Sequence, residues 1–163
     1  MDEGTKQGAR IGPVQNRKQY ERVKDLLQEA RQQGHIILGG SALDRPGYFV
    51  EPTIVTGVQE GSRLVDEEQF GPILPIMKFS DPDAAVARAN ATTFGLGASV
   101  WSSNGERAMK IAERLEAGTV WINKHAELVP GIPFGGAKES GIGVEFAEEG
   151  VLEFTQLKII NAA

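Results

Sequence analysis

The first clear pattern along the chain is helical. Between residues 16 and 33, apolar residues recur three or four positions apart, at Tyr20, Val23, Leu26, Leu27 and Ala30. This spacing gathers them on one face and predicts an amphipathic α-helix. Asn16 is suited to cap the start of this helix, and Gly34 is suited to a left-handed conformation at its end. Apolar runs then predict extended chain over 35–38 and 48–55.

The middle of the chain alternates between helical and extended patterns. We expect, in order, a helix over 80–92 capped by Ser80, a buried strand over 96–101, a helix from Ser103 or Asn104 that stops at Gly118, and a strand over 119–122. Such alternation with short joints is typical of parallel βαβ units. The pattern therefore predicts an α/β fold with a partial parallel sheet and flanking helices.

The two ends of the chain carry weaker patterns. Residues 1–15 are polar and rich in glycine, which predicts a loop or a loose N-terminal arm. A further helix is expected around 144–149 and a final strand over 157–160. A late edge strand is a ready pairing surface for another chain, although an edge strand covered within the same monomer remains an equal alternative.

Composition narrows the class of protein. Of the 163 residues, 40% are hydrophobic and 24% are charged, as in soluble globular proteins. Lys and Arg number 17 against 22 Asp and Glu, so the net charge of −5 argues against a nucleic-acid partner. No apolar run is long enough for a membrane span, and the first residues lack a signal-peptide pattern, so we expect a cytoplasmic protein without a membrane partner.

Cysteine is absent from the sequence. The chain therefore supplies no disulfide, no thiolate metal ligand and no cysteine nucleophile. The two histidines, His35 and His125, are too few for a histidine metal site, and no metal site is expected. His125 is a conceivable base, but a lone histidine without an evident acid partner is more often a surface or loop residue.

An acidic and aromatic segment, 66–72, is the first place with chemical potential. A carboxylate here could accept two hydrogen bonds from a vicinal diol such as a ribose, while Phe70 offers a flat face to a planar ring. The alternative is a solvated acidic helix end followed by a phenylalanine of the core. The residue pattern alone leaves both interpretations open.

A glycine-rich segment, 133–143, is the second. Its glycines need either positive φ or very close packing, but neither the P-loop spacing nor the full dinucleotide fingerprint is present. A structural turn region is therefore the alternative to a binding loop. A third segment, 118–125, ends a predicted parallel strand in polar residues, and such carboxyl ends are where α/β sheets bind ligands.

Together these segments resemble the C-terminal part of the aldehyde dehydrogenase superfamily. In the family's order, the matching segments are Gly12-Pro13, 47–53 (GYFVEPT), 67–72 (EEQFGP), 94–98 (FGLGA), 118–123 (GTVWIN) and 133–143 (PFGGAKESGIG). Each segment is weak alone, but six of them in order are specific. The resemblance implies that residues 16–143 correspond to the later portion of the family's catalytic domain, and 144–163 to a helix and an oligomerisation strand.

The resemblance also implies roles for four side chains. The acid that holds the nicotinamide ribose hydroxyls in the family falls on Glu68, and the aromatic residue near the nicotinamide falls on Phe70. The phenylalanine beside the aldehyde tunnel falls on Phe134, and Leu128 is the expected pocket residue in the variable loop before it. The strand over 157–160 resembles the one through which family members associate.

The family's chemistry needs parts that lie outside these segments. In the family, a Cys thiolate attacks the aldehyde, a hydride passes to the nicotinamide, and a Glu-activated water cleaves the thioester. The Cys segment, the general-base segment and the complete dinucleotide-binding domain are all absent here. We therefore expect a truncated chain that is inactive alone, supplies no catalytic residue and binds NAD or NADP weakly or not at all. The alternative is an interaction module that associates with itself or with a full-length aldehyde dehydrogenase.

Overall fold

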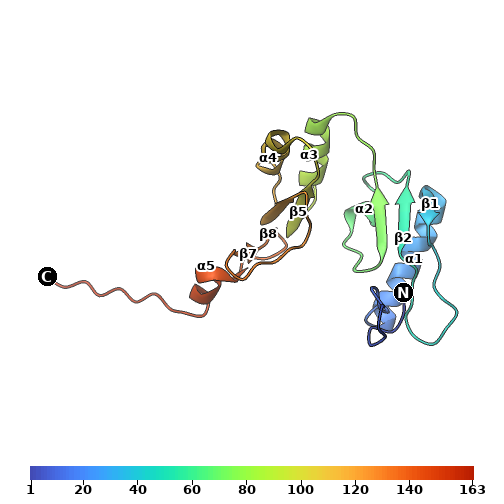
Figure 1. Ribbon diagram of the computed structural model, residues 1–163, viewed down its shortest axis with the longest axis horizontal. Helices are drawn as coiled ribbons and strands as arrows, with labels where there is room; N and C mark the ends of the chain where they lie inside the picture. Colours follow the sequence, from blue (N-terminus) through green and yellow to red (C-terminus); the bar gives the residue numbers. More distant parts are fainter. The chain divides into compact units, whose positions relative to one another are not determined.

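The computed structural model describes all 163 residues (Figure 1). The chain consists of two compact units, Met1–Lys78 and Phe79–Ala163. The first unit contains α1 (Arg17–Gln33), β1 (His35–Leu38), β2 (Thr53–Thr56), α2 (Arg63–Asp66) and β3 (Ile73–Ile76). The second contains α3 (Pro82–Asn90), β4 (Phe94–Gly95), β5 (Gly97–Val100), α4 (Gly105–Ala112), β6 (Thr119–Ile122), β7 (Phe134–Gly135), β8 (Ala137–Lys138), β9 (Val144–Glu145) and α5 (Ala147–Leu152). None of these helices has the length and apolar character to cross a bilayer.

Helix α1 organises the first unit, as its apolar spacing predicts. Asn16 caps it, because the side-chain oxygen of Asn16 accepts a hydrogen bond of 2.9 Å from the backbone N–H of Gln19. The apolar face of α1 packs with residues of β2, β3, α2 and the neighbouring loops, and together they form a core of Val23, Leu26, Leu27, Ala30, Val50, Val55, Val58, Leu64 and Ile73. This burial holds the helix in place.

Gly34 ends α1 for a different reason from the one expected. Its φ of −144° and ψ of −163° are extended, so the predicted left-handed conformation is wrong. A Cβ at this position would lie 2.6 Å from the carbonyl oxygen of Thr56 and 2.8 Å from Val58 Cγ1. The glycine therefore permits the end of the helix to approach the backbone of β2 closely.

The sheet of the first unit is mixed, with strand order β1-β2-β3. Strand β1 runs antiparallel to β2, whereas β2 and β3 are parallel. The sequence pattern did not predict this parallel pair, but the α/β class is confirmed. The extended runs over 35–38 and 48–55 are also found, the second as β2 with an isolated bridge between Ala42 and Val50.

The second unit contains a βαβ unit, as predicted. Strands β5 and β6 pair in parallel from Gly97 and Thr119 to Val100 and Ile122, and α4 lies between them in the chain. Asn104, one of the two expected caps, accepts a hydrogen bond of 2.9 Å from Arg107 N–H.

Two helix boundaries and the burial of one strand differ from the prediction in this region. Asp81 rather than Ser80 caps α3, because its carboxylate accepts from the N–H of Asp83 at 3.0 Å. Helix α4 ends at Ala112, well before Gly118. Strand β5 is also less buried than expected, since Gly97 is exposed and the other three residues are half-buried.

The glycine-rich segment forms short antiparallel strand pairs, β4 with β8 and β7 with β9. A Cβ at Gly118 would lie 1.8 Å from the carbonyl oxygen of Gly135, so the backbone packs against itself there. The expected helix over 144–149 is corrected to β9 followed by α5, because β9 pairs with β7 and ends the extended chain only at Glu145.

The final strand expected over 157–160 is not formed. These residues have no regular secondary structure, and Figure 1 shows the chain extended after α5. A strand exists only where its N–H and C=O groups pair with a neighbour, and no strand of this chain pairs with the tail. The side chains of Leu157 and Ile160 are consequently 85% and 81% exposed.

Candidate functional site

The loop 67–72, which joins α2 to β3 in the first unit, is held by side chains of α1. Gln19 Nε2 donates hydrogen bonds to the carbonyl oxygens of Gln69 and, at 3.3 Å, Phe70. Arg22 Nη2 donates to the carbonyl oxygen of Glu68 at 2.9 Å. Three successive carbonyls of the loop therefore receive donors from one helix, which fixes the planes of their peptide bonds.

The three acids before Phe70 differ in what they contact. Asp66 Oδ2 accepts a hydrogen bond of 2.9 Å from the N–H of Gly61. Glu67 pairs with Arg63 at 3.0 Å and with Arg22 at 3.3 Å. The hydrogen bond from Arg63 lowers the pKa of the Glu67 carboxyl. Glu68 is exposed, so its carboxylate is the acid of this group available to an incoming hydroxyl pair.

Phe70 has an uncommon backbone conformation. Its φ is +44°, which is rare for a bulky side chain and costs about 1–3 kcal/mol. The residue is 74% exposed, so Phe70 is not the core residue that the alternative interpretation expects. An exposed ring on a strained but well-held backbone is typical of a functional loop rather than of a packing position.

Gly71 allows this loop to lie directly on α1. A Cβ at Gly71 would lie 2.4 Å from Cγ2 of Val23, a fully buried residue of the core. Across the same turn, Gln69 Nε2 donates to the carbonyl oxygen of Ile73 at 2.6 Å. The loop is therefore bound at both ends, and Glu68 and Phe70 are presented together from it.

In the second unit, Phe134 belongs to an aromatic group around Trp121. The ring centroids of these two residues are 6.4 Å apart, and the ring of His125 meets Trp121 edge-on at 5.6 Å. Trp121 is buried, and its Nε1–H donates to the carbonyl oxygen of Glu127 at 3.0 Å. Leu128 follows that anchored carbonyl and is half exposed. Trp121 thus links Phe134 to the loop that carries Leu128.

Asn123, at the carboxyl end of β6, uses its side chain internally. Its Oδ1 accepts from the N–H of Ser102 at 2.9 Å, and its Nδ2 donates to the carbonyl oxygen of Ser102 at 3.0 Å. These two bonds tie together the segments that follow β5 and β6. Its φ of +55° is one that asparagine tolerates better than most residues. Asn123 is therefore a structural clasp at the sheet edge where ligand binding is expected.

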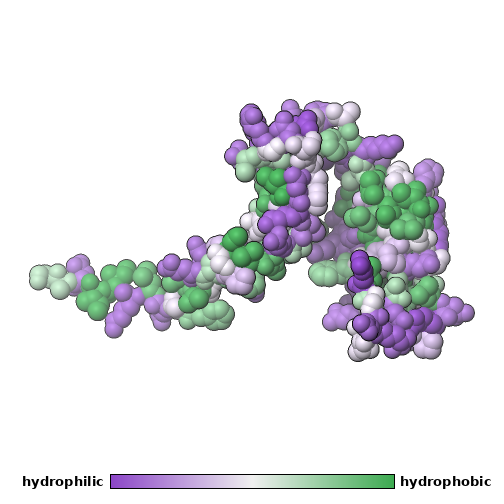
Figure 2. Space-filling model, in the orientation of Figure 1, coloured by the Kyte–Doolittle hydropathy of each residue, from purple (hydrophilic) through white to green (hydrophobic).

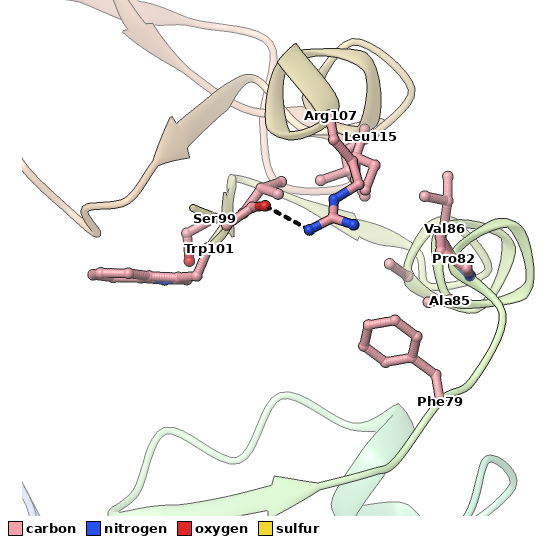
Figure 3. A pocket seen from close by; sticks show the side chains of 12 residues that line it. Phe79, Pro82, Ala85, Val86, Ser99, Trp101, Arg107 and Leu115 are labelled. Atoms are coloured by element: carbon pink, nitrogen blue, oxygen red, sulfur yellow. Dashed lines mark hydrogen bonds between the residues drawn. The ribbon is translucent and has the colours of Figure 1, made fainter. Parts of the chain in front are cut away.

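The second unit also contains an apolar groove of about 550 Å³, which the sequence did not reveal. Phe79, Val86 and Leu115 point into it from the segments around α3 and α4 (Figure 3). Arg107 spans its wall, where Nη2 donates to Ser102 Oγ at 3.2 Å. None of the four predicted site residues lines this groove.

The structure thus brings the predicted residues together in pairs. Glu68 and Phe70 share one loop of the first unit, while Leu128 and Phe134 are linked through Trp121 in the second. Sequence reasoning missed the residues that position them, Gln19 and Trp121 among these. The sequence signal that could have pointed to Gln19 and Arg22 is their spacing of three residues, which places both on one face of α1.

Comparison with known proteins identifies the class. The model of the aldehyde dehydrogenase family matches residues 1–160. The NADP(+) succinate-semialdehyde dehydrogenase of Deinococcus radiodurans is 42% identical over 154 residues, which cover 94% of this chain and 32% of the relative. Human retinaldehyde dehydrogenase 3 is 39% identical over 151 residues, 92% of this chain and 30% of that protein.

A solved structure gives the same assignment. The Mycobacterium tuberculosis aldehyde dehydrogenase complexed with NAD+ aligns with a TM-score of 0.85 at 37% identity, over 91% of this chain and 31% of that one. The chain belongs to the aldehyde dehydrogenase family, which confirms the resemblance seen in its motifs. It spans about a third of the length of the curated relatives that it matches.

Proposed function

We propose that this chain supplies one wall of an aldehyde dehydrogenase site, for the oxidation of an aldehyde to a carboxylic acid with NAD or NADP. In this proposal the Glu68 carboxylate accepts hydrogen bonds from the two hydroxyls of the nicotinamide ribose, and the Phe70 ring lies near the nicotinamide. The observation that carries the proposal is the loop that exposes both side chains, two residues apart, from a backbone held on α1. The nicotinamide, when bound, would accept the hydride of the substrate.

The residues proposed to contact the aldehyde, Leu128 and Phe134, lie in the second unit. Phe134 packs near Trp121, and Leu128 follows the carbonyl that Trp121 holds, so both belong to one anchored region. We propose that they form apolar wall for the substrate. Half-exposed Leu128 is then the position at which substrate size is selected.

We further propose that the chain does not catalyse this reaction alone and that it works in the cytoplasm. The sequence holds no cysteine, so it offers no thiolate to form the thiohemiacetal. The test is to incubate the pure chain with short and long aldehydes and NAD or NADP, and to follow absorbance of the reduced nicotinamide. No turnover is expected, and steady turnover with any aldehyde would show that this part of the proposal is wrong.

Cofactor contact is tested separately from turnover. Nicotinamide mononucleotide, which carries the ribose without the adenine half, is titrated into the isotope-labelled chain and followed by NMR. We expect shifts at the backbone N–H of Glu68 and Phe70 with an affinity near millimolar, or about −4 kcal/mol. The Glu68→Ala variant should lose them, while Glu153→Ala, which removes an exposed acid elsewhere, should not. Absence of shifts at these residues would contradict the assignment.

The second function, an interaction module, is favoured by the C-terminal tail. Phe154, Leu157 and Ile160 are almost fully exposed, and Figure 2 shows hydrophobic surface along this stretch. We propose that the tail pairs as an added strand with another copy or with a full-length relative. Light scattering at tens of micromolar should give a dimer or larger species, and Leu157→Lys should reduce it. A monomeric parent chain would count against this function.

A further inference from the structure

We propose that Gln19 and Arg22 of α1 are positioning residues that hold the backbone of Phe70 in its left-handed conformation. This inference rests on the proposed function of Glu68 and Phe70 in cofactor contact. In this proposal the two α1 side chains act on the loop backbone. They set the direction in which the ring of Phe70 and the carboxylate of Glu68 leave the loop.

The contacts converge on one short stretch of backbone. Gln19 reaches the carbonyls of Gln69 and Phe70 with a single amide group, and Arg22 reaches the carbonyl of Glu68. Because Gln19 and Arg22 are one helical turn apart, both project from the same face of α1. α1 also carries four buried core residues, so the donors stand on an element that is anchored in the core of the unit.

Phe70 needs such support because its own side chain disfavours the conformation. A residue with a bulky Cβ at φ of +44° relaxes toward negative φ unless its neighbours prevent it. Rotation at Phe70 would turn the carbonyls of Gln69 and Phe70 away from Gln19. Each hydrogen bond to α1 therefore opposes that relaxation directly.

Arg22 has a second effect, because it contacts the carboxylate of one of the two neighbouring acids, Glu67, and not that of Glu68. Its Nη2 contacts the Glu67 carboxylate at 3.3 Å as well as the Glu68 carbonyl. Glu67 is thus paired, while Glu68 is exposed. The Nε of Arg22 is buried without a hydrogen-bond partner, which costs free energy. The position of the guanidinium is therefore set by the two contacts of its Nη2, and these leave the Nε–H unpaired. That arrangement suits a group that positions a loop.

The test uses the full chain and compares Gln19→Glu with Gln28→Glu. The first variant is nearly isosteric but replaces the amide donor by an acceptor; the second makes the same change at an exposed position of α1. The NMR readout is the intraresidue N–H to Hα Overhauser effect of Phe70, which is strong only at positive φ. We expect this signal to be lost in Gln19→Glu and kept in Gln28→Glu. The melting temperatures of the two variants are measured as a control for folding, and we expect them to be equal.

Nicotinamide mononucleotide binding supplies the second readout. Gln19→Glu should weaken it about tenfold, the effect of one lost hydrogen bond. Arg22→Lys keeps a donor for the Glu68 carbonyl and should retain the Phe70 signal, whereas Arg22→Ala should diminish it. If Gln19→Glu lowers the melting temperature strongly, the comparison of Arg22→Lys with Arg22→Ala decides the question instead.

The outcomes separate the two proposals. If Phe70 keeps its positive φ in both Gln19→Glu and Arg22→Ala, the positioning role is wrong, whatever the ligand does. If the parent chain shows the Phe70 signal but no response of Glu68 to the mononucleotide, the cofactor assignment is wrong while the backbone role stands. Loss of the Phe70 signal together with weaker binding supports both.

Discussion

The two loops that carry the proposed site residues are held in opposite ways. Loop 67–72 receives hydrogen bonds along its carbonyls from a buried helix, and its glycine packs on the core of the first unit. The segment 123–133 is fixed at Asn123 and at the Glu127 carbonyl, and all of its residues are exposed. The contrast indicates that one loop presents a fixed geometry, while the other leaves its side chains free to vary.

Of the substitutions that test this contrast, Gly71→Ala should have the largest effect on the free energy of unfolding. The new Cβ would lie 2.4 Å from the side chain of buried Val23, so the loop must lift off α1 or the core must shift. We expect a loss of about 1–3 kcal/mol in the free energy of unfolding. Gly131→Ala, in the exposed loop, meets no atom within 4 Å and should be neutral. Urea denaturation of both variants checks the difference, and equal effects would refute it.

Asn123→Ala addresses the fixed end of the second loop. It removes both bonds to Ser102 and places a less tolerant residue at φ of +55°. The expected loss is about 1–2 kcal/mol by the same denaturation. Asn123→Gly accepts the backbone conformation but lacks the amide, so it isolates the contribution of the hydrogen bonds. A neutral Asn123→Ala variant would mean that the clasp is unimportant.

Trp121→Phe tests the internal anchor of the same loop. The ring contact with Phe134 is largely kept, but the hydrogen bond to the Glu127 carbonyl is lost, which should destabilise by about 1 kcal/mol. Amide exchange should accelerate after Glu127. Trp101→Phe, at a tryptophan that is 66% exposed, serves as the control. Unchanged exchange in Trp121→Phe would show that the loop does not depend on this bond.

The smallest effect concerns the acids of the first loop. The pKa of Glu67 is lowered from 4.5, first by its hydrogen bond from Arg63, so the folded state binds this proton less readily than the unfolded state. The resulting stability is present above pH 4.5 and is lost as the pH falls through the lower folded value. We expect Glu67→Gln to reduce slightly the loss of unfolding free energy at acid pH, and exposed Glu153→Gln to leave it unchanged. Urea denaturation at a series of pH values checks both variants. Identical pH profiles would show that the pair contributes nothing.

The cap and the buried face of α1 were predicted from the sequence, whereas the contact that ends this helix was not. The cap at Asn16 and the apolar face of α1 depend on residues within one helix, so their spacing sufficed. Gly34 was expected to be left-handed because only its helix was visible, whereas its actual neighbours, Thr56 and Val58, lie far along the chain.

The candidate site shows the same limit. Glu68, Phe70, Leu128 and Phe134 came from a family resemblance, and no periodicity distinguishes Glu68 from paired Glu67. Glu67 pairs with Arg63, four residues before it, and with Arg22, which is 45 positions away, and only the first of these pairs is visible as a local pattern. The strand expected over 157–160 failed for a related reason, since an apolar run does not by itself provide a pairing partner.

The backbone contact between Gly118 and Gly135 has a consequence for engineering. Because these glycines meet without room for a side chain, they close the base of the segment that contains Asn123 and Leu128. This glycine contact does not involve the side chains in the middle of the segment, such as Leu128. Each doubling of a flexible loop adds only about 0.6 kcal/mol of closure entropy. The tip beyond the Trp121 anchor is therefore a position at which longer or exchanged segments can be grafted without redesigning the sheet beneath.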